Sequence, residues 1–208
     1  MRHSATTTAI ATISKAAHLK ALKVMGFNRR GNHLFRPSND LFHVVNFQAS
    51  QWGSKDAGQF TINVAITSRV LFEFWAGKAF PSNPGSALFP ITRRIGGLMP
   101  QRLDHWWPVD GTSDIGALEH DVTQTIVSHA LPFFSAYPES SVLLTRLREG
   151  LGLPGCTSAQ CTLLHAMLAQ IAGLSDEAAV QISKALVDAG SSPFKATVML
   201  IGQRIGAL

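Results

Sequence analysis

The sequence contains little cysteine and no long apolar run. Two cysteines in 208 residues, Cys156 and Cys161, are too few for the disulfide framework of a small secreted protein. Nowhere do about 18 apolar residues follow one another, as a membrane helix requires, and the N-terminal segment lacks the continuous apolar stretch of a secretion signal. These absences predict a soluble cytoplasmic protein with reduced thiols and no membrane partner.

The common catalytic motifs are absent as well. The chain has no GxSxG elbow, phosphate-binding loop, GxGxxG turn or HExxH helix. Asp104 and His105 are adjacent, but neighbouring side chains on a strand point in opposite directions, so these two residues make a poor catalytic pair. The sequence therefore favours a protein that is not an enzyme, and it indicates no cofactor.

The composition is that of a folded globular protein, with 46% hydrophobic and 15% charged residues. Lysine and arginine outnumber aspartate and glutamate by 18 to 13, and the largest basic cluster contains no acidic residue. Its members are Lys15, Lys20, Lys23, Arg29, Arg30 and Arg36. Such a cluster can contact the phosphates of a nucleic acid. The aromatic platforms of nucleic-acid binders are missing, however, so a solvated helix face is the favoured interpretation.

The apolar residues of the first half follow two different periods. A helical period over residues 8–25 predicts a helix that ends at Gly26, a residue suited to a left-handed cap. A period of two then predicts the strands of one antiparallel sheet. These strands cover residues 33–36, 42–49, 60–67 and 91–95, with a short fifth strand at 105–108. Residues 69–90 are irregular and rich in Pro, Gly and Ser, as in a lid or a variable insertion.

After Asp110 the period becomes helical again. One apolar stripe covers residues 115–129, and Pro132 is expected to end or kink that helix. Further helices are predicted at 140–149, 157–172 and 175–189, and from 193 onward. The break GLGLPG at 150–155 contains Leu151 and Leu153, which a solvated linker would not be expected to carry.

The expected fold class is therefore α+β. An antiparallel sheet of four to five strands is flanked by helices, and an all-helical C-terminal extension follows. The expected units are residues 1–138 and residues 139–208, with the second unit packed on the first.

Five short segments stand out between Gly26 and Trp107. They are GFNRRG, NFQ, FTIN, RIG and the pair WW. In these segments the chain resembles the bacterial domain of unknown function 4304 family, and the resemblance covers roughly residues 8–138. Because that family has no assigned activity, the resemblance implies a lineage and no particular reaction.

One face of the predicted sheet is polar, because polar residues alternate with apolar ones in two neighbouring strands. In the register that joins the two apolar faces, Asn46 faces Asn63. One tryptophan of the pair at 106–107 is expected on this polar face and the other in the core. The candidate ligand-binding residues are Asn46, Gln48, Thr61, Asn63, Arg94 and Trp107.

A row of amides with a guanidinium can bind a planar polar or anionic ligand, or a peptide backbone. The same amides can instead pair with one another and fix the strand register. The sequence favours a non-enzymatic module that binds a small polar or anionic ligand, or another protein, through this face. The alternative is a small-molecule hydrolase or transferase around Asn46, Asn63 and Arg94. A carboxylate or histidine that converges on an open cleft there would favour the enzyme.

Cys156, Cys161 and His165 are close in sequence, and the last two have the spacing of one helical turn, which can chelate zinc. With Thr157 as the helix N-cap, however, the two cysteines occupy the positions of a hydrophobic staple. A fourth ligand is missing nearby. The sequence therefore predicts a staple of reduced thiols and no metal.

Overall fold

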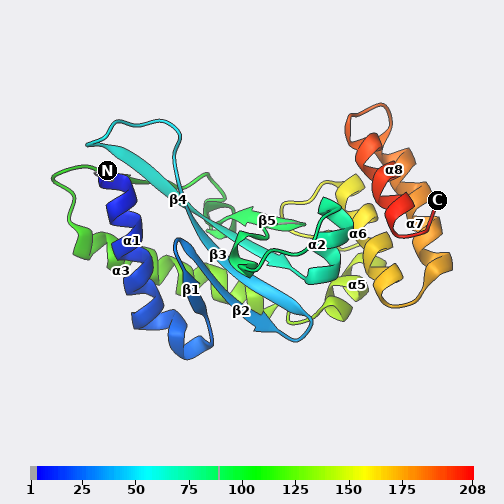
Figure 1. Cartoon of the computed structure of the whole chain (residues 1–208), viewed down its shortest axis with the longest axis horizontal. Coiled ribbons are helices and arrows are strands. Elements are labelled where there is room, and N and C mark those ends of the chain that lie inside the picture. The colour runs from blue at the N-terminus through cyan, green and yellow to red at the C-terminus, as the bar shows by residue number, and fades with distance from the viewer. Residues whose placement is uncertain (1–3, 89) are drawn as a thin grey trace.

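The computed structural model describes residues 4–88 and 90–208. Its centre is a six-stranded antiparallel sheet (Figure 1). The strands are β1 (Asn28–Arg30), β2 (His33–Ser38), β3 (Leu41–Ala49), β4 (Gly58–Thr67), β5 (Ile91–Arg94) and β6 (Trp107–Val109). Strands β1 to β5 lie side by side in chain order, and β6 pairs with β4 on the edge that β5 also occupies. The predicted α+β class with an antiparallel sheet is confirmed.

The alternation of side chains sets the register of the two longest strands. Phe47 of β3 pairs with Ile62 of β4, and both side chains are fully buried on the apolar face. Because successive side chains point to opposite faces, Asn46 and Asn63 pair on the other face. This is the predicted register. A slip by one residue would move every apolar side chain of one strand to the polar face.

Strand β1 and helix α2 (Arg69–Ala76) differ from the sequence-based expectation. Strand β1 contains no apolar residue, yet it pairs with β2 across a turn in which Gly31 has a φ of 62°. Helix α2 lies in the 69–90 connection, which the sequence indicates as irregular. Ser68 caps its first turn, and Gly77 ends it with a φ of 63°. The helix spans about two turns, too few for a clear helical period.

The remaining helices bear out most of the predicted pattern. They are α1 (Ala5–Ala17), α3 (Ile115–Thr125), α4 (Leu131–Ser135), α5 (Ser140–Arg148), α6 (Ser158–Ile171), α7 (Ser175–Ala189) and α8 (Phe194–Arg204). Helix α1 continues through a π turn and a 3₁₀ turn to the predicted cap at Gly26, whose φ is 82°. Thr157 forms the predicted capping box with Gln160. Within the described residues, no helix is long and apolar enough to cross a membrane.

Pro132 does not end its helix. A π turn (Ile126–Ala130) joins α3 to α4, and the Leu131 N–H donates to the Ile126 carbonyl at its end. Pro132 therefore falls in the first turn of α4, where a residue without an N–H breaks no helical hydrogen bond. The wide turn lets one long helix pass through a proline.

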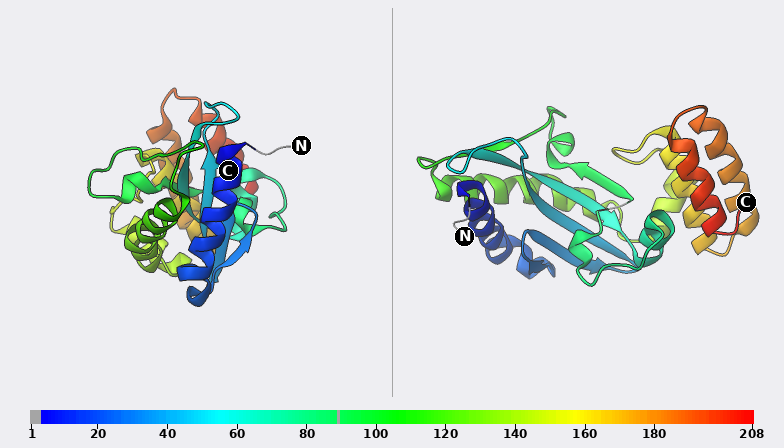
Figure 2. Two further views of the ribbon diagram at one scale, coloured as in Figure 1. Left: turned by 90° about the vertical axis from the view of Figure 1, so that its left-hand side faces the viewer. Right: turned by 45° about the horizontal axis from the view of Figure 1, so that its top comes forward.

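Helices α1 and α3 cover the apolar face of the sheet, and α6 to α8 extend the molecule beyond one end of the sheet (Figures 1 and 2). One contiguous apolar core joins these parts. It includes Ile10 of α1, Ile62 of β4, Leu163 of α6 and Ile201 of α8. Leu153, in the GLGLPG break, is buried in the same core.

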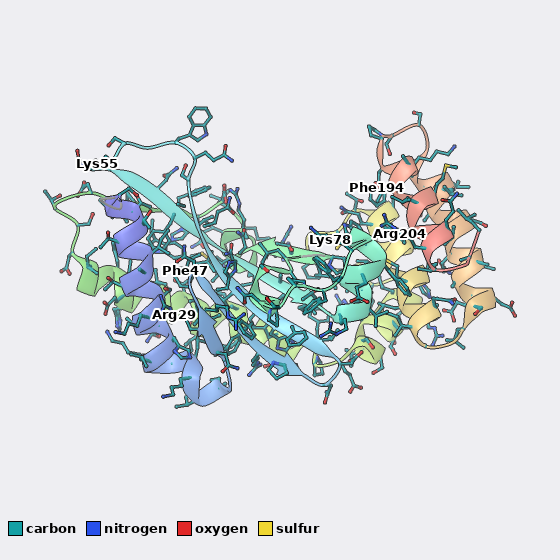
Figure 3. The ribbon with its side chains drawn as sticks, in the orientation of Figure 1. Arg29, Phe47, Lys55, Lys78, Phe194 and Arg204 are labelled. Carbon is teal, nitrogen blue, oxygen red and sulfur yellow. The ribbon has the colours of Figure 1, made fainter. Side chains whose placement is uncertain are left out.

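A polar contact also ties the C-terminal helices to α2. Arg204 Nη1 donates to the carbonyl oxygens of Phe74 at 3.0 Å and Trp75 at 2.9 Å, in the last turn of α2. The ring of Trp75 lies 6.2 Å from that of Phe194. Arg204 thus lies against the C-terminal end of α2, close to Lys78 (Figure 3). Helix α8 therefore supports an element of the sheet-containing part.

A chain that ends at Glu149 tests how far this shared core determines stability. We expect it to retain β-sheet structure but to aggregate, because removal of α6 to α8 exposes apolar surface on α2 and α5. Circular dichroism and size-exclusion chromatography would measure both properties. A truncated chain that stays monomeric with unchanged thermal stability would contradict the shared core.

His43 joins β3 to the end of α4. Its ring stacks on Phe134 with centroids 4.6 Å apart, and its Nε2 lies 3.0 Å from the Tyr137 carbonyl oxygen. Arg36 Nε donates to His43 Nδ1 at 3.3 Å. Since Nδ1 accepts, the proton of the neutral ring is on Nε2 and is donated to Tyr137. Burial lowers the pKa of His43 from 6.5 to about 4; the Tyr137 hydrogen bond opposes this shift, and the Arg36 charge adds to it.

We expect acid to destabilise the fold through His43. The folded pKa lies below the unfolded value, so the unfolded chain binds more protons, and stability is lost as pH falls from about 6.5 towards 4. The contribution between pH 7.5 and pH 5 is about 2 kcal/mol. His43→Gln should be less stable at pH 7.5 but should lose about 2 kcal/mol less on acidification, measured by urea unfolding. If both chains lose the same free energy of unfolding on acidification, the acid sensitivity comes from groups other than His43.

Candidate functional site

A hydrogen-bonded row crosses β2, β3 and β4 on the polar face of the sheet. Asn63 Nδ2 donates to Asn46 Oδ1 at 3.1 Å and to Gln48 Oε1 at 2.7 Å. Asn46 Nδ2 lies 3.1 Å from His33 Nδ1 and completes the row. Asn46 and Asn63 are 8% and 7% exposed. The central amides therefore satisfy one another and fix the pairing of the strands.

The row determines the tautomer of His33. Because the Asn46 amide nitrogen donates to Nδ1, the proton of the neutral ring is on Nε2, which is then free to donate to the Gly85 backbone. Burial lowers the pKa of His33, and the hydrogen bond with Gly85 opposes this shift. A second proton on Nδ1 would face the Asn46 amide hydrogens, so the neutral ring is the form that suits the row.

The 69–90 connection covers one end of the polar face. Phe80 stacks on Phe42 of β3 with ring centroids 5.5 Å apart and meets Phe72 of α2 edge-on. A Cβ at Gly85 would lie 2.4 Å from the Cβ of His33, so the backbone passes directly over β2. This end of the face is filled by the protein itself.

Thr61 is buried in the fold. It pairs with Gln48 in the predicted register, is fully buried, and donates from Oγ1 to the His105 carbonyl oxygen at 2.8 Å. The hydrogen bond anchors the segment that leads into β6. Thr61 is therefore a residue of the polar face that the protein itself covers, and it is not exposed to a ligand.

The open end of the face is built around Arg94. Arg94 pairs with Asn63 in the sheet, and its guanidinium lies 4.8 Å from the centroid of the Trp106 ring. Asp104 Oδ2 accepts from Arg94 Nη1 at 2.5 Å and from Trp106 Nε1 at 2.8 Å. The side chains of Arg94 and Asp104 are 42% and 49% exposed. This trio presents a stacked guanidinium and a carboxylate to solvent.

Trp107 does not lie on this face. It pairs with Phe60 on the apolar side, where the two rings stack at 5.4 Å, and it is 3% exposed. Its Nε1 donates to Asp121 of α3 at 2.6 Å. One tryptophan of the pair lies on each face, as the alternation predicts, but the solvent-facing one is Trp106. The alternation alone leaves both choices open, since each residue can continue one of the two faces.

An open pocket of about 420 Å³ lies beside Arg94 and Trp106. Its other lining residues are Gln48, Ser50, Gln51, Trp52 and Gln59. The β3–β4 loop, which also carries Lys55, projects beyond the sheet and forms one wall (Figures 1 and 3). Trp52 in this loop is 84% exposed. The pocket thus combines amides, a guanidinium and two indoles, and of the predicted site residues it includes Gln48 and Arg94.

Most of the basic cluster is engaged within the fold. Lys20 pairs with Glu119 of α3 at 2.7 Å. Arg29 donates to Ser14 and to the Ala11 carbonyl, and Arg30 donates to the Ser82 carbonyl. These contacts join the first helix and β1 to α3 and to the 69–90 connection.

The two cysteines contact one another, as the staple predicts. Cys156 precedes the Thr157 cap of α6, Cys161 is on the first turn, and the two side chains are hydrogen-bonded. His165 Nε2 lies 2.6 Å from Glu177 Oε1. Within residues 4–88 and 90–208, no group of three or more His, Cys, Asp or Glu residues is placed to hold a metal ion.

The fold and the site together define an α+β protein with a half-covered polar sheet face and a pocket at its open end. The chain belongs to the family described as "Domain of unknown function (DUF4304)", whose model matches residues 18–136. The match contains all six strands and the pocket, and it leaves α1 and α5 to α8 outside. Comparison with curated proteins and with solved structures gave no match.

We expect Asn63→Ala to lower the free energy of unfolding by about 1–3 kcal/mol, because it leaves the Asn46 and Gln48 oxygens without their donor. Gln51→Ala is the matched control, since this amide is on the exposed loop and should change stability by less than about 0.5 kcal/mol. Urea unfolding measures both. Equal effects would show that the amide row does not stabilise the sheet.

Proposed function

We propose that this protein is a cytoplasmic binding module that takes a small planar ligand with polar edges in the pocket beside Arg94 and Trp106. A peptide segment of a partner protein offers the same amide chemistry and is the alternative occupant. The observation that carries the proposal is Trp52, an indole 84% exposed at the wall of a pocket that also contains a stacked guanidinium. Aromatic side chains in such positions supply large contact areas to planar ligands.

The polar groups of the pocket support a ligand with both donors and acceptors. Gln48, Gln51 and Gln59 can each donate and accept hydrogen bonds. Asp104 already neutralises the charge of Arg94, so a strongly anionic ligand would have to compete with that carboxylate. An amide, a heterocyclic base or a peptide bond matches these groups better than an isolated phosphate or carboxylate does.

A hydrolase or transferase around Asn46, Asn63 and Arg94 receives less support. His33 converges on Asn46, but its two ring nitrogens are used by Asn46 and Gly85. The carboxylate of Asp104 accepts from Arg94 and Trp106. Because both candidate acid–base groups hold the fold in this way, the arrangement supports binding over catalysis.

The test is nuclear magnetic resonance of the indole N–H signals of the four tryptophans, with a panel of primary amides, heterocyclic bases, small carboxylates and short peptides. We expect amides or bases to shift the signals of Trp52 and Trp106 and to leave that of the buried Trp107 unchanged. Trp52→Ala should weaken the binding of a responding probe by about tenfold.

Val24→Ala is the matched control for this substitution, because Val24 is also 84% exposed, lies in the 3₁₀ turn before Gly26 and does not line the pocket. It should leave binding unchanged. If no probe shifts either indole, or if both variants weaken binding equally, the proposed pocket is wrong.

A further inference from the structure

A second pocket, of about 290 Å³, lies between the 150–157 segment, α6 and α7. Both cysteines of the chain line it, together with Thr162, His165, Gln181 and Lys184. The proposed binding function uses none of these residues. The pocket is outside the part of the chain that matches the family.

Two donors converge on the sulfur of Cys161. The backbone N–H of Leu153 donates to Sγ at 3.4 Å, and the Cys156 thiol donates to the same sulfur. Cys161 is also on the first turn of α6, where the helix dipole favours negative charge. Such surroundings stabilise a thiolate. The hydrogen bond from Cys156 lowers the pKa of Cys161 below its ordinary value; burial opposes this shift, and the Leu153 hydrogen bond adds to it.

Cys156 has the complementary role. Its thiol keeps its proton because that proton is donated to Cys161, and this hydrogen bond together with burial raises the pKa of Cys156. At a pH below the ordinary pKa of cysteine the pair therefore holds one proton, which is on Cys156, and the negative charge is on Cys161. A thiolate next to a thiol is the arrangement that thiol–disulfide exchange requires.

Cationic groups face the pair from several elements. Lys184 of α7 lines the pocket. Arg93 of β5 lies against Gly155, and its positive charge opposes the rise in the pKa of Cys156. Arg93 Nε is buried and has no hydrogen-bond partner among the described residues. The other titratable groups nearby are His165, Glu177, Arg148, Tyr137 and Arg146. Glu177 is held by both Arg148 and His165, so its charge is balanced and leaves the thiolate undisturbed.

We propose that Cys161 and Cys156 form a dithiol site that reacts with low-molecular-weight disulfides of the peptide-thiol class. The Cys161 thiolate attacks one sulfur of the small disulfide, a Cys161 mixed disulfide forms, and the first small thiol leaves. Cys156 then loses its proton and attacks Cys161 Sγ, which releases the second small thiol. One small disulfide is reduced to two thiols, and the two protein thiols are oxidised to one internal disulfide.

The pocket suits a peptide thiol in particular. Lys184 can pair with a carboxylate, and Gln181 can bond to an amide, while the sulfur lies towards Cys161. A staple that serves packing alone would need neither the polar lining nor the donors on one sulfur.

Alkylation of the reduced full-length chain by iodoacetamide between pH 5 and pH 9, read by peptide mass spectrometry, is the first test. We expect Cys161 to react about tenfold or more faster than Cys156 at pH 7, with a midpoint of its rate below the ordinary cysteine pKa of about 8.5. Cys156→Ser keeps a donor and should retain this profile. Cys156→Ala removes the donor and should move the midpoint upward.

Oxidised glutathione is the second probe. The wild-type chain should acquire an internal disulfide, Cys156→Ser should stop at a Cys161 mixed disulfide, and Cys161→Ser should stay unmodified. The urea-unfolded chain, in which both thiols are ordinary, is the control that needs no variant. Equal alkylation of the two thiols in the folded chain would overturn the proposal. A wild-type chain that keeps both thiols, or that stops at the mixed disulfide, would overturn it as well.

Discussion

The pairing of β3 with β4 constrains the rest of the molecule. These strands are the longest in the sheet, and their register places a continuous apolar face towards α1 and α3. The same register aligns Asn46 with Asn63, so one set of backbone hydrogen bonds positions both the core and the amide row. Strand β2 adds His33 to that row because His33 pairs with Asn46, and β5 places Arg94 beside Asn63. The site is thus a direct consequence of how the core is buried.

The predictable parts of the fold are those in which burial imposes a period. The strands β2 to β5, the long helices and the Asn46–Asn63 pair follow from alternation and from helical spacing. Strand β1 has no apolar residue, so nothing in its sequence distinguishes it from a turn. Helix α2 is too short to establish a period. The helix continues past Pro132 because of a π turn, and a π turn is defined by backbone hydrogen bonds that leave no pattern of apolar residues in the sequence.

The candidate site was predictable in its centre and less so at its open end. The central amides Asn46 and Asn63, and also Gln48 and Arg94 at the open end, follow from the alternation of their strands. Trp106 and Asp104 lie where the strand pattern is weakest, and the choice between two adjacent tryptophans depends on which one continues the apolar face. Trp52 lies on a loop, whose conformation leaves no periodic signal. The contact between the two cysteines follows from their positions beside the Thr157 cap. The hydrogen bond from the Leu153 N–H to Cys161 does not, because it depends on how the GLGLPG segment folds back on α6.

Both edges of the sheet are short. The outer edge is β1, three residues long, which includes two arginines. The opposite edge of β4 is divided between β5 and β6, and the intervening segment bulges out with a 3₁₀ turn at Ile95–Leu98. A second molecule would therefore find only brief, interrupted or charged runs of free backbone groups on which to add a strand. The sheet can leave part of one face open to solvent and still resist growth into intermolecular β-structure.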